Sequence, residues 1–289
     1  IEDSEVAYVM DVGFDLPSSE RAVSDAALLP WCYAAVGVHP HDTKTMTEEI
    51  YEKIRRLAGQ PKVQAIGEIG LDFYYNHSDA EDQRYWFRRQ IRLANELHMP
   101  IVIHAREADQ ETMDILKEEG AFSEERCGWF PPRPGTGIGR KAGAQTTQKA
   151  SRAGEGGQAE ACEAGRAEAC DCTENCCMEK DARVLLHCFS GSRELAEQYV
   201  KLGATISIAG PVTYKNNRKT SEVVSAIPIE YLLVETDAPY LTPEPHRGKK
   251  NQSPYVAYTA RRVALLKGIS YEEAARRTLE NAKRFYGID

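Results

Sequence analysis

Residues 231–248 read YLLVETDAPYLTPEPHRG, and this stretch decides the fold class. It begins with an apolar run, residues 231–234, which is followed by Glu235 and Asp237 and then by a loop of prolines and bases. A short apolar run with such a boundary is typical of a strand buried on both faces, and such strands belong to parallel α/β sheets. Because ligands bind at the carboxyl ends of parallel strands, Asp237 lies where a functional site is expected. A turn-capping role would also use an aspartate there.

The rest of the chain alternates strand and helix. We expect seven strands, at residues 6–12, 33–38, 63–69, 101–104, 184–189, 204–209 and 231–235. Capping-box sequences at 45–48, 78–81 and 270–273 open three of the intervening helices. This alternation predicts βαβ units and a parallel sheet. Seven strands do not close a (β/α)8 TIM-type barrel, but they are what such a barrel would show without its first strand and helix.

Composition bounds the class of protein. With 289 residues, of which 42% are hydrophobic and 28% charged, we expect a single globular domain over 1–289. No apolar run approaches the ~18 residues that cross a bilayer, and the first residues resemble no signal peptide, so a cytoplasmic location without membrane contact is expected. The net charge of −8 argues against a basic domain that wraps nucleic acid. A polyanionic substrate would need metal ions and local bases.

One segment, residues 131–179, interrupts the alternation. It contains no valine and no leucine and is rich in Gly, Ala, Glu, Arg and Cys, so we expect a disordered, removable insertion. It holds five of the eight cysteines, namely Cys162, Cys170, Cys172, Cys176 and Cys177. Their spacing lacks paired C-x2-C knuckles, which disfavours a structural zinc site, and a reducing cytosol disfavours disulfides. Cys32 and Cys188 are expected in the core.

Four of the expected strand ends carry side chains that bind metals. They are Glu68, His104, His187 and Asp237. Burying one histidine or glutamate in an apolar strand is costly unless it is paired, and a hydrogen-bonded core role would explain any one of them alone. Four at the same ends of parallel strands predict a metal centre. Carboxylate and imidazole ligands suit Mn²⁺, Zn²⁺ or, with more water, Mg²⁺.

Six longer motifs follow one another along the chain, and they are, in order, GVHPHD, AIGEIGLDFYYN, PIVIHAREA, LLHCFSGS, ISIAGPVTYK and LLVETDAPYLTPEPHRGKKNQSPYV. In this order they resemble the motifs of the TatD-type metal-dependent deoxyribonucleases. They cover nearly the whole chain outside the insertion. The resemblance implies a distorted (β/α)8 barrel with two divalent ions, Mg²⁺ favoured and Mn²⁺ or Zn²⁺ as alternatives. It also implies phosphodiester hydrolysis, as a 3′-to-5′ exonuclease on single-stranded DNA ends.

The resemblance assigns roles to single residues. Glu68 corresponds to the carboxylate near both metals, and His104 and His187 correspond to ligands of one metal. Asp237 corresponds to the acid that binds the other metal and orients the attacking water. His39 matches a motif position that contacts the scissile phosphate, although a turn histidine before a proline would look the same.

The family pattern is incomplete at its start. Members of the family begin with a strand that ends in His-x-His, which supplies two ligands to the metal shared with Asp237. No such pair precedes residue 6 here, and the first residue is Ile rather than Met. We therefore expect that the first strand, the first helix and two ligands are missing, and that this chain has weak activity or none.

Other residues near the expected site could contact the substrate. Arg106 and Arg247 are expected to contact phosphate, although both would also serve as ordinary surface bases. Tyr74 and Tyr75 could stack on a nucleobase, but packing against the next helix is favoured. Two rival functions remain: a barrel hydrolase acting on a small-molecule C–N or ester bond, and a catalytically impaired remnant. A monomer is expected.

Overall fold

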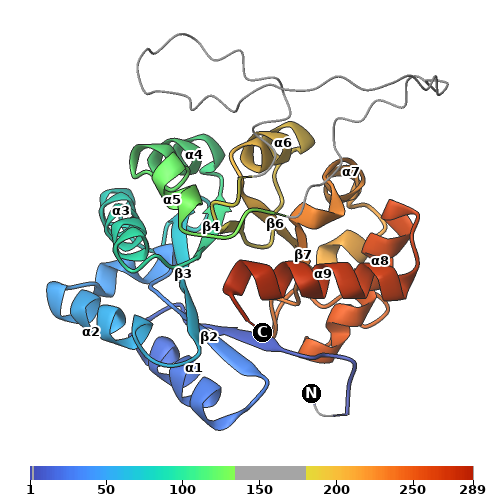
Figure 1. Cartoon of the computed structure of the whole chain (residues 1–289), viewed down its shortest axis with the longest axis horizontal. Coiled ribbons are helices and arrows are strands. Elements are labelled where there is room, and N and C mark those ends of the chain that lie inside the picture. Colours follow the sequence, from blue (N-terminus) through green and yellow to red (C-terminus); the bar gives the residue numbers. More distant parts are fainter. Residues whose placement is uncertain (2, 134–179, 289) are drawn as a thin grey trace, which may run out of the picture.

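The computed structural model describes residues 1, 3–133 and 180–288. Its centre is a parallel sheet of seven strands in sequence order, β1 to β7. The strands are β1 (Val9–Val12), β2 (Cys32–Val36), β3 (Val63–Asp72), β4 (Ile101–Arg106), β5 (Val184–Leu186), β6 (Thr205–Ile208) and β7 (Leu232–Val234). All seven predicted strands are confirmed, with several ends shifted by a few residues. Figure 1 shows the sheet curling within a ring of helices, and β1 and β7 form its two edges.

Helices α1 to α7 lie between successive strands, α8 and α9 follow β7, and the helices lie mainly on the outside of the curl (Figure 1). They are α1 (Leu16–Leu28), α2 (Glu48–Ala58), α3 (Ala80–Glu96), α4 (Asp109–Glu118), α5 (Glu124–Gly128), α6 (Arg193–Lys201), α7 (Arg218–Ala226), α8 (Val256–Lys267) and α9 (Tyr271–Tyr286). Short 3₁₀ turns lie between them, at η1 (Pro40–Thr45), η3 (Gly210–Thr213), η4 (Ile229–Tyr231) and η5 (Ser253–Tyr255). Within the described ranges, no helix is both long and apolar enough to span a bilayer.

Alternation along the strands divides the core in two. The outer set packs under the helices and includes Val36, Ile66, Ile103, Leu186 and Leu232. Their chain neighbours on the inner face belong to a second cluster, and they are Ala35, Ala65, Val102, Leu185 and Leu233. Phe285 and Tyr286, at the end of α9, join that inner cluster. Because side chains alternate between faces, both faces are apolar, as the continuous runs predicted.

The three predicted helix starts are found, but two of the caps are shifted. Ser270 caps α9 as predicted, whereas α2 is capped by Thr47 rather than by Thr45, the first residue of its capping-box sequence. At residues 78–81 the cap is Asp79, which accepts from the Glu81 N–H at 2.9 Å, rather than Ser78. The Ser78 hydroxyl instead donates to the His41 carbonyl at 2.7 Å, so it ties the start of α3 to η1.

Arg133 corrects the boundary of the predicted insertion. Its side chain was expected in the disordered segment, but the residue is only 2% exposed. The guanidinium donates to the Glu230 carbonyl at 3.0 Å, to the Thr205 hydroxyl at 2.7 Å and to the Asp181 carboxylate at 3.2 Å. The expectation is therefore wrong for Arg133, because this cation satisfies polar groups at the amino ends of β6 and β7. The remaining insertion residues from 134 to 179, including the five cysteines, lie outside the described residues.

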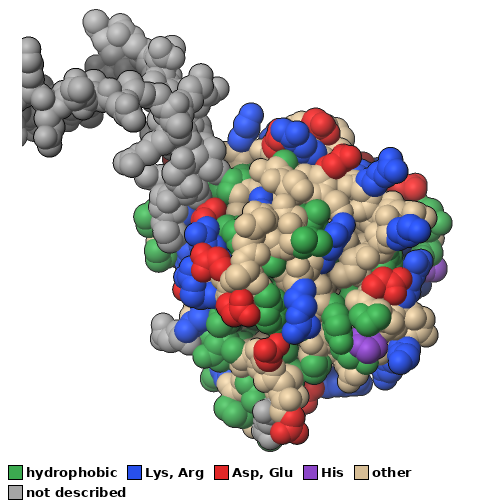
Figure 2. Space-filling model, turned by 90° about the vertical axis from the view of Figure 1, so that its right-hand side faces the viewer, with side chains coloured by type: hydrophobic (Ala, Val, Ile, Leu, Met, Phe, Trp, Pro, Cys, Tyr) green, Lys and Arg blue, Asp and Glu red, His purple; other side chains and the backbone are tan. Residues whose placement is uncertain are grey.

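Charge on the surface is mixed. On the face that Figure 2 shows, Lys and Arg side chains are interspersed with Asp and Glu rather than gathered into a single field. That face offers no continuous basic surface for a polyanion, in keeping with the net charge of −8.

Candidate metal centre

The centre of the site is Glu68, near the middle of β3. The β3–β4 pairing shifts register between Ile66 and Ile69, and Gly67 lies in this irregular step. A Cβ atom on Gly67 would lie 2.6 Å from Cβ of Val102 and 2.8 Å from its carbonyl oxygen. Only glycine allows β3 to approach β4 this closely, so the Gly67 position fixes where Glu68 leaves the strand.

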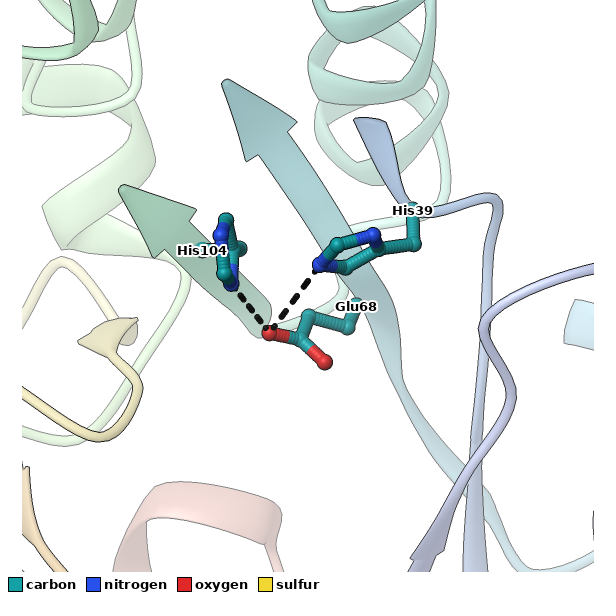
Figure 3. Close-up of side chains that lie close together, drawn as sticks. All are labelled: His39, Glu68 and His104. Atoms are coloured by element: carbon teal, nitrogen blue, oxygen red, sulfur yellow. Dashed lines mark hydrogen bonds and ion pairs between the residues drawn. The ribbon is translucent and has the colours of Figure 1, made fainter. Parts of the chain in front are cut away.

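Three imidazoles surround one oxygen of Glu68. Oε1 lies 3.0 Å from Nδ1 of His104, 3.8 Å from Nε2 of His187 and 3.9 Å from Nε2 of His39. The histidines come from β4, from the residue after β5 and from the loop after β2. Figure 3 shows His39 and His104 pointing toward Glu68 from two sides. Strands far apart in sequence thus deliver their polar ends to one mouth.

Asp237 lies on the other side of His187. Its Oδ1 is 3.4 Å from Nε2 of His187, the nitrogen that also faces Glu68. The loop after β7 is held by Asn251, which is buried and whose amide donates to the carbonyls of Thr236 at 2.7 Å and Tyr240 at 2.6 Å. The four residues predicted as metal ligands therefore lie together.

His39 also lies in this cluster. The resemblance implies that it contacts the scissile phosphate, and ligand atoms of His39, Glu68 and His104 all lie within 4.8 Å of one another. This spacing allows His39 to act as a ligand of the same cation as Glu68. Its imidazole Nδ1 also accepts from the His41 N–H at 3.2 Å, so the turn role is present as well.

Two carboxylates that sequence reasoning missed orient the histidines. Asp72 lies 3.2 Å from Nε2 of His104, and Glu235 lies 2.7 Å from Nδ1 of His187. The other ring nitrogen of each histidine, Nδ1 of His104 and Nε2 of His187, faces Glu68. Partners of this kind set the tautomer and orientation of metal-ligating histidines. The available signal was position, since Asp72 and Glu235 both stand at strand ends within the quoted motifs.

Burial and charge set the protonation of the cluster. Burial raises the pKa of Glu68, but His187, His104 and His39 outweigh it and hold that pKa well below its usual range. Burial lowers the pKa of His104, yet hydrogen bonds to Asp72 and Glu68 raise it overall to about 8. The pKa of His187 is raised well above its usual value, since its carboxylate neighbours outweigh burial. Burial lowers the pKa of His39 to about 3, which leaves its imidazole neutral.

These donors fit a divalent cation. An ionised, buried carboxylate with imidazole nitrogens at comparable distances is the donor set that Mn²⁺ and Zn²⁺ prefer, and Mg²⁺ would use the carboxylates with more water. Glu68, His39 and His104 could hold one ion, and His187 lies between Glu68 and Asp237, 3.8 Å from the first and 3.4 Å from the second. A cleft of about 350 Å³ between β1 and β7 reaches Glu68, His187 and Asp237 and gives access to them.

The predicted phosphate-binding arginines lie outside the cluster. Neither Arg106 nor Arg247 makes a hydrogen bond or ion pair with the four predicted ligands in the described part of the chain. Arg106 lies over the rings of Tyr74 and Tyr75, with Cζ 4.2 Å and 4.5 Å from their centroids. Arg247, in the loop after β7, lies 4.3 Å over the ring of Tyr214.

Comparison with known proteins agrees with this geometry. The sequence model of a family described as "TatD related DNase" matches residues 1–127 and 162–287. The chain is 37% identical over 284 residues to the uncharacterized metal-dependent hydrolase YabD of Bacillus subtilis (strain 168), covering 98% of this chain and 89% of that protein. It is 30% identical over 289 residues to the "3'-5' ssDNA/RNA exonuclease TatD" of Erwinia tasmaniensis, covering 98% and 89%.

Solved structures show the same fold. The crystal structure of YJJV, a TatD homologue from Escherichia coli K12, superimposes with a TM-score of 0.72 at 21% identity. The match covers 98% of this chain and 87% of that one. At this identity the likeness concerns the fold, which in these neighbours is TIM-barrel-like.

Proposed function

This chain belongs to the TatD-related DNase family of metal-dependent hydrolases, and from that premise we propose that it hydrolyses phosphodiester bonds in single-stranded DNA from the 3′ end. The observation that carries the proposal is the Glu68 cluster, in which one ionised carboxylate meets three imidazoles beside Asp237. A relative 30% identical to this chain is named for that activity on single-stranded DNA and RNA.

The residues have distinct roles in this proposal. Glu68, His39 and His104 hold one divalent ion, and Asp237 with His187 and a share of Glu68 forms the second position. Bound divalent ions lower the pKa of water and offset the negative charge of the phosphate. The Asp237 carboxylate accepts the proton of the water that attacks phosphorus. Arg106 and Arg247 contact phosphate oxygens of the substrate.

The two ion positions are unequal. The first has Glu68 and neutral or hydrogen-bonded imidazoles around a single oxygen, whereas the second depends on Asp237, on the shared Glu68 and on His187, which is held by Glu235. Each position has two unshared ligands, but in the described ranges only the atoms of the first, on His39, Glu68 and His104, all lie within 4.8 Å of one another, and a less convergent set binds an ion more weakly. We therefore expect one ion to bind well and the second poorly, with correspondingly slow hydrolysis.

The test is release of nucleotides from a single-stranded oligonucleotide labelled at its 5′ end. With Mn²⁺ or Mg²⁺ we expect shortening from the 3′ end, which EDTA abolishes and which Glu68→Gln and Asp237→Asn reduce at least a hundredfold. Glu96→Gln serves as the matched control, because Glu96 forms only an exposed ion pair with Arg55. Hydrolysis of a small amide or ester without any cleavage of nucleic acid would refute the proposal and favour the rival hydrolase.

A further inference from the structure

Two exposed tyrosines stand beside the metal centre, directly after β3. The carboxylate of Asp72 accepts from the backbone N–H of Tyr74 at 3.0 Å and of Tyr75 at 2.9 Å. Its other oxygen lies 3.2 Å from His104 and 2.7 Å from His41. Asp72 is fully buried, so one fixed group positions both the tyrosines and a predicted metal ligand.

The tyrosines do not pack in the way the sequence predicted. Tyr74 is 53% exposed and Tyr75 is 49% exposed. Phe73 takes the packing role instead: it is partly buried against the core, and the Arg84 guanidinium lies 5.2 Å over its ring. The expectation that Tyr74 and Tyr75 pack against the next helix is therefore wrong, and about half of each side chain is exposed to solvent.

Arg106 holds these rings in place. It ends β4, two residues after His104, and its guanidinium lies over both tyrosine rings. In the ranges that the structure describes, no carboxylate pairs with this cation. A guanidinium that uses its face for aromatic rings keeps its edge donors available, and those donors match a phosphate.

The rings form a continuous path from the metal centre. The ring of His41 lies 6.1 Å from that of His104 and 5.6 Å from that of Tyr75, centroid to centroid. Tyr75 also lies parallel to His77, at 5.5 Å and 4°. Tyr75 is thus two ring contacts away from His104, which places the open tyrosine faces within reach of a nucleotide whose phosphate is at the metal centre.

We propose that Tyr74 and Tyr75 are a stacking platform for an unpaired nucleobase next to the scissile phosphate, with Arg106 contacting that phosphate. The inference rests on the proposed function and adds which residues select single-stranded over double-stranded ends. A base that stacks on protein rings must leave its duplex, so the platform favours single-stranded ends. Stacking of this kind tolerates any base, because every base has an aromatic face.

The test compares binding of two single-stranded phosphorothioate oligonucleotides, labelled at the 5′ end, that differ only in an abasic 3′-terminal nucleotide. Affinities are measured by fluorescence anisotropy with Mn²⁺ on the full chain. We expect the wild type to prefer the base-bearing strand about tenfold, equal to about 1.4 kcal/mol. Tyr74→Ala/Tyr75→Ala should lose this preference, and Tyr74→Phe/Tyr75→Phe, which keeps the rings, should retain it.

Tyr85→Ala is the matched control, because Tyr85 is 50% exposed on α3 and lies outside this ring cluster. It should retain the wild-type preference. Equal affinity of the wild type for both strands, or an unchanged preference in the double alanine variant, would overturn the platform. Absence of cleavage from an ordinary oligonucleotide, with the tenfold preference intact, would refute the nuclease proposal and leave the binding platform standing.

Discussion

Replacing Asp72 by asparagine should weaken metal binding without unfolding the chain. The Asp72 carboxylate is buried and accepts from two backbone N–H groups while facing His104 and His41. An asparagine amide oxygen can keep the two backbone bonds, since it occupies the same volume. The NH₂ group that replaces the second oxygen cannot accept from Nε2–H of His104, so the tautomer that leaves Nδ1 free for a metal is no longer held. Removing such a partner costs tenfold to a hundredfold in metal affinity.

The expected loss corresponds to about 1.4–2.7 kcal/mol of binding free energy. Isothermal titration with Mn²⁺ would measure it, with thermal unfolding of the metal-free protein recorded in parallel. Glu96→Gln, which changes an exposed carboxylate of similar charge, should leave the affinity unchanged. An Asp72→Asn variant that binds Mn²⁺ as tightly as the wild type would refute the orienting role of Asp72.

Three further predictions concern stability. Replacing residues 134–179 with a short Gly-Ser linker should leave a folded protein of similar thermal midpoint. The side chains of Arg133 and Asp181, which flank the segment, meet at 3.2 Å, so a short linker can join the two ends. Loss of all soluble protein would contradict this prediction. Arg133→Ala should lower the free energy of unfolding by about 3–5 kcal/mol, since it breaks a buried pair; a denaturant midpoint equal to that of the wild type would disprove the role of Arg133. Burial raises the pKa of Glu119, but Arg92 and Arg88 lower that pKa overall, so the Glu119 carboxylate stabilises the fold above the ordinary glutamate pKa and loses this effect as the pH falls. Glu119→Gln should therefore flatten that part of the acid unfolding curve. An unfolding curve identical to that of the wild type would contradict this role of Glu119.

Much of the fold, and the convergence of the four candidate ligands, follows from the sequence. Continuous apolar runs with polar ends predicted all seven strands, and their common direction placed Glu68, His104, His187 and Asp237 together before any contact was known. Asp72 and Glu235 were missed for a physical reason. They act on the histidines through hydrogen bonds across strands, and their position at strand ends does not say which histidine each one meets until the strand pairing is known.

Other errors came from reading residue types without their neighbours. Tyr74 and Tyr75 look like packing residues, but Phe73 beside them fills the core position and a tight turn exposes both. Arg133 is an arginine in a segment rich in Gly, Ala, Glu, Arg and Cys, so nothing in the sequence distinguishes it from the insertion. Its burial depends on carbonyl groups at the starts of β6 and β7, which are distant in sequence and unsatisfied until the sheet forms.

The measurement that tests the metal centre most directly is an anomalous difference map from crystals soaked in Mn²⁺. We predict that the strongest peak lies about 2 Å from a carboxylate oxygen of Glu68 and from ring nitrogens of His39 and His104, with a weaker peak beside Asp237 and His187. Glu68→Gln crystals should lose the strong peak. A strongest peak remote from Glu68, or none at millimolar Mn²⁺, would contradict the account.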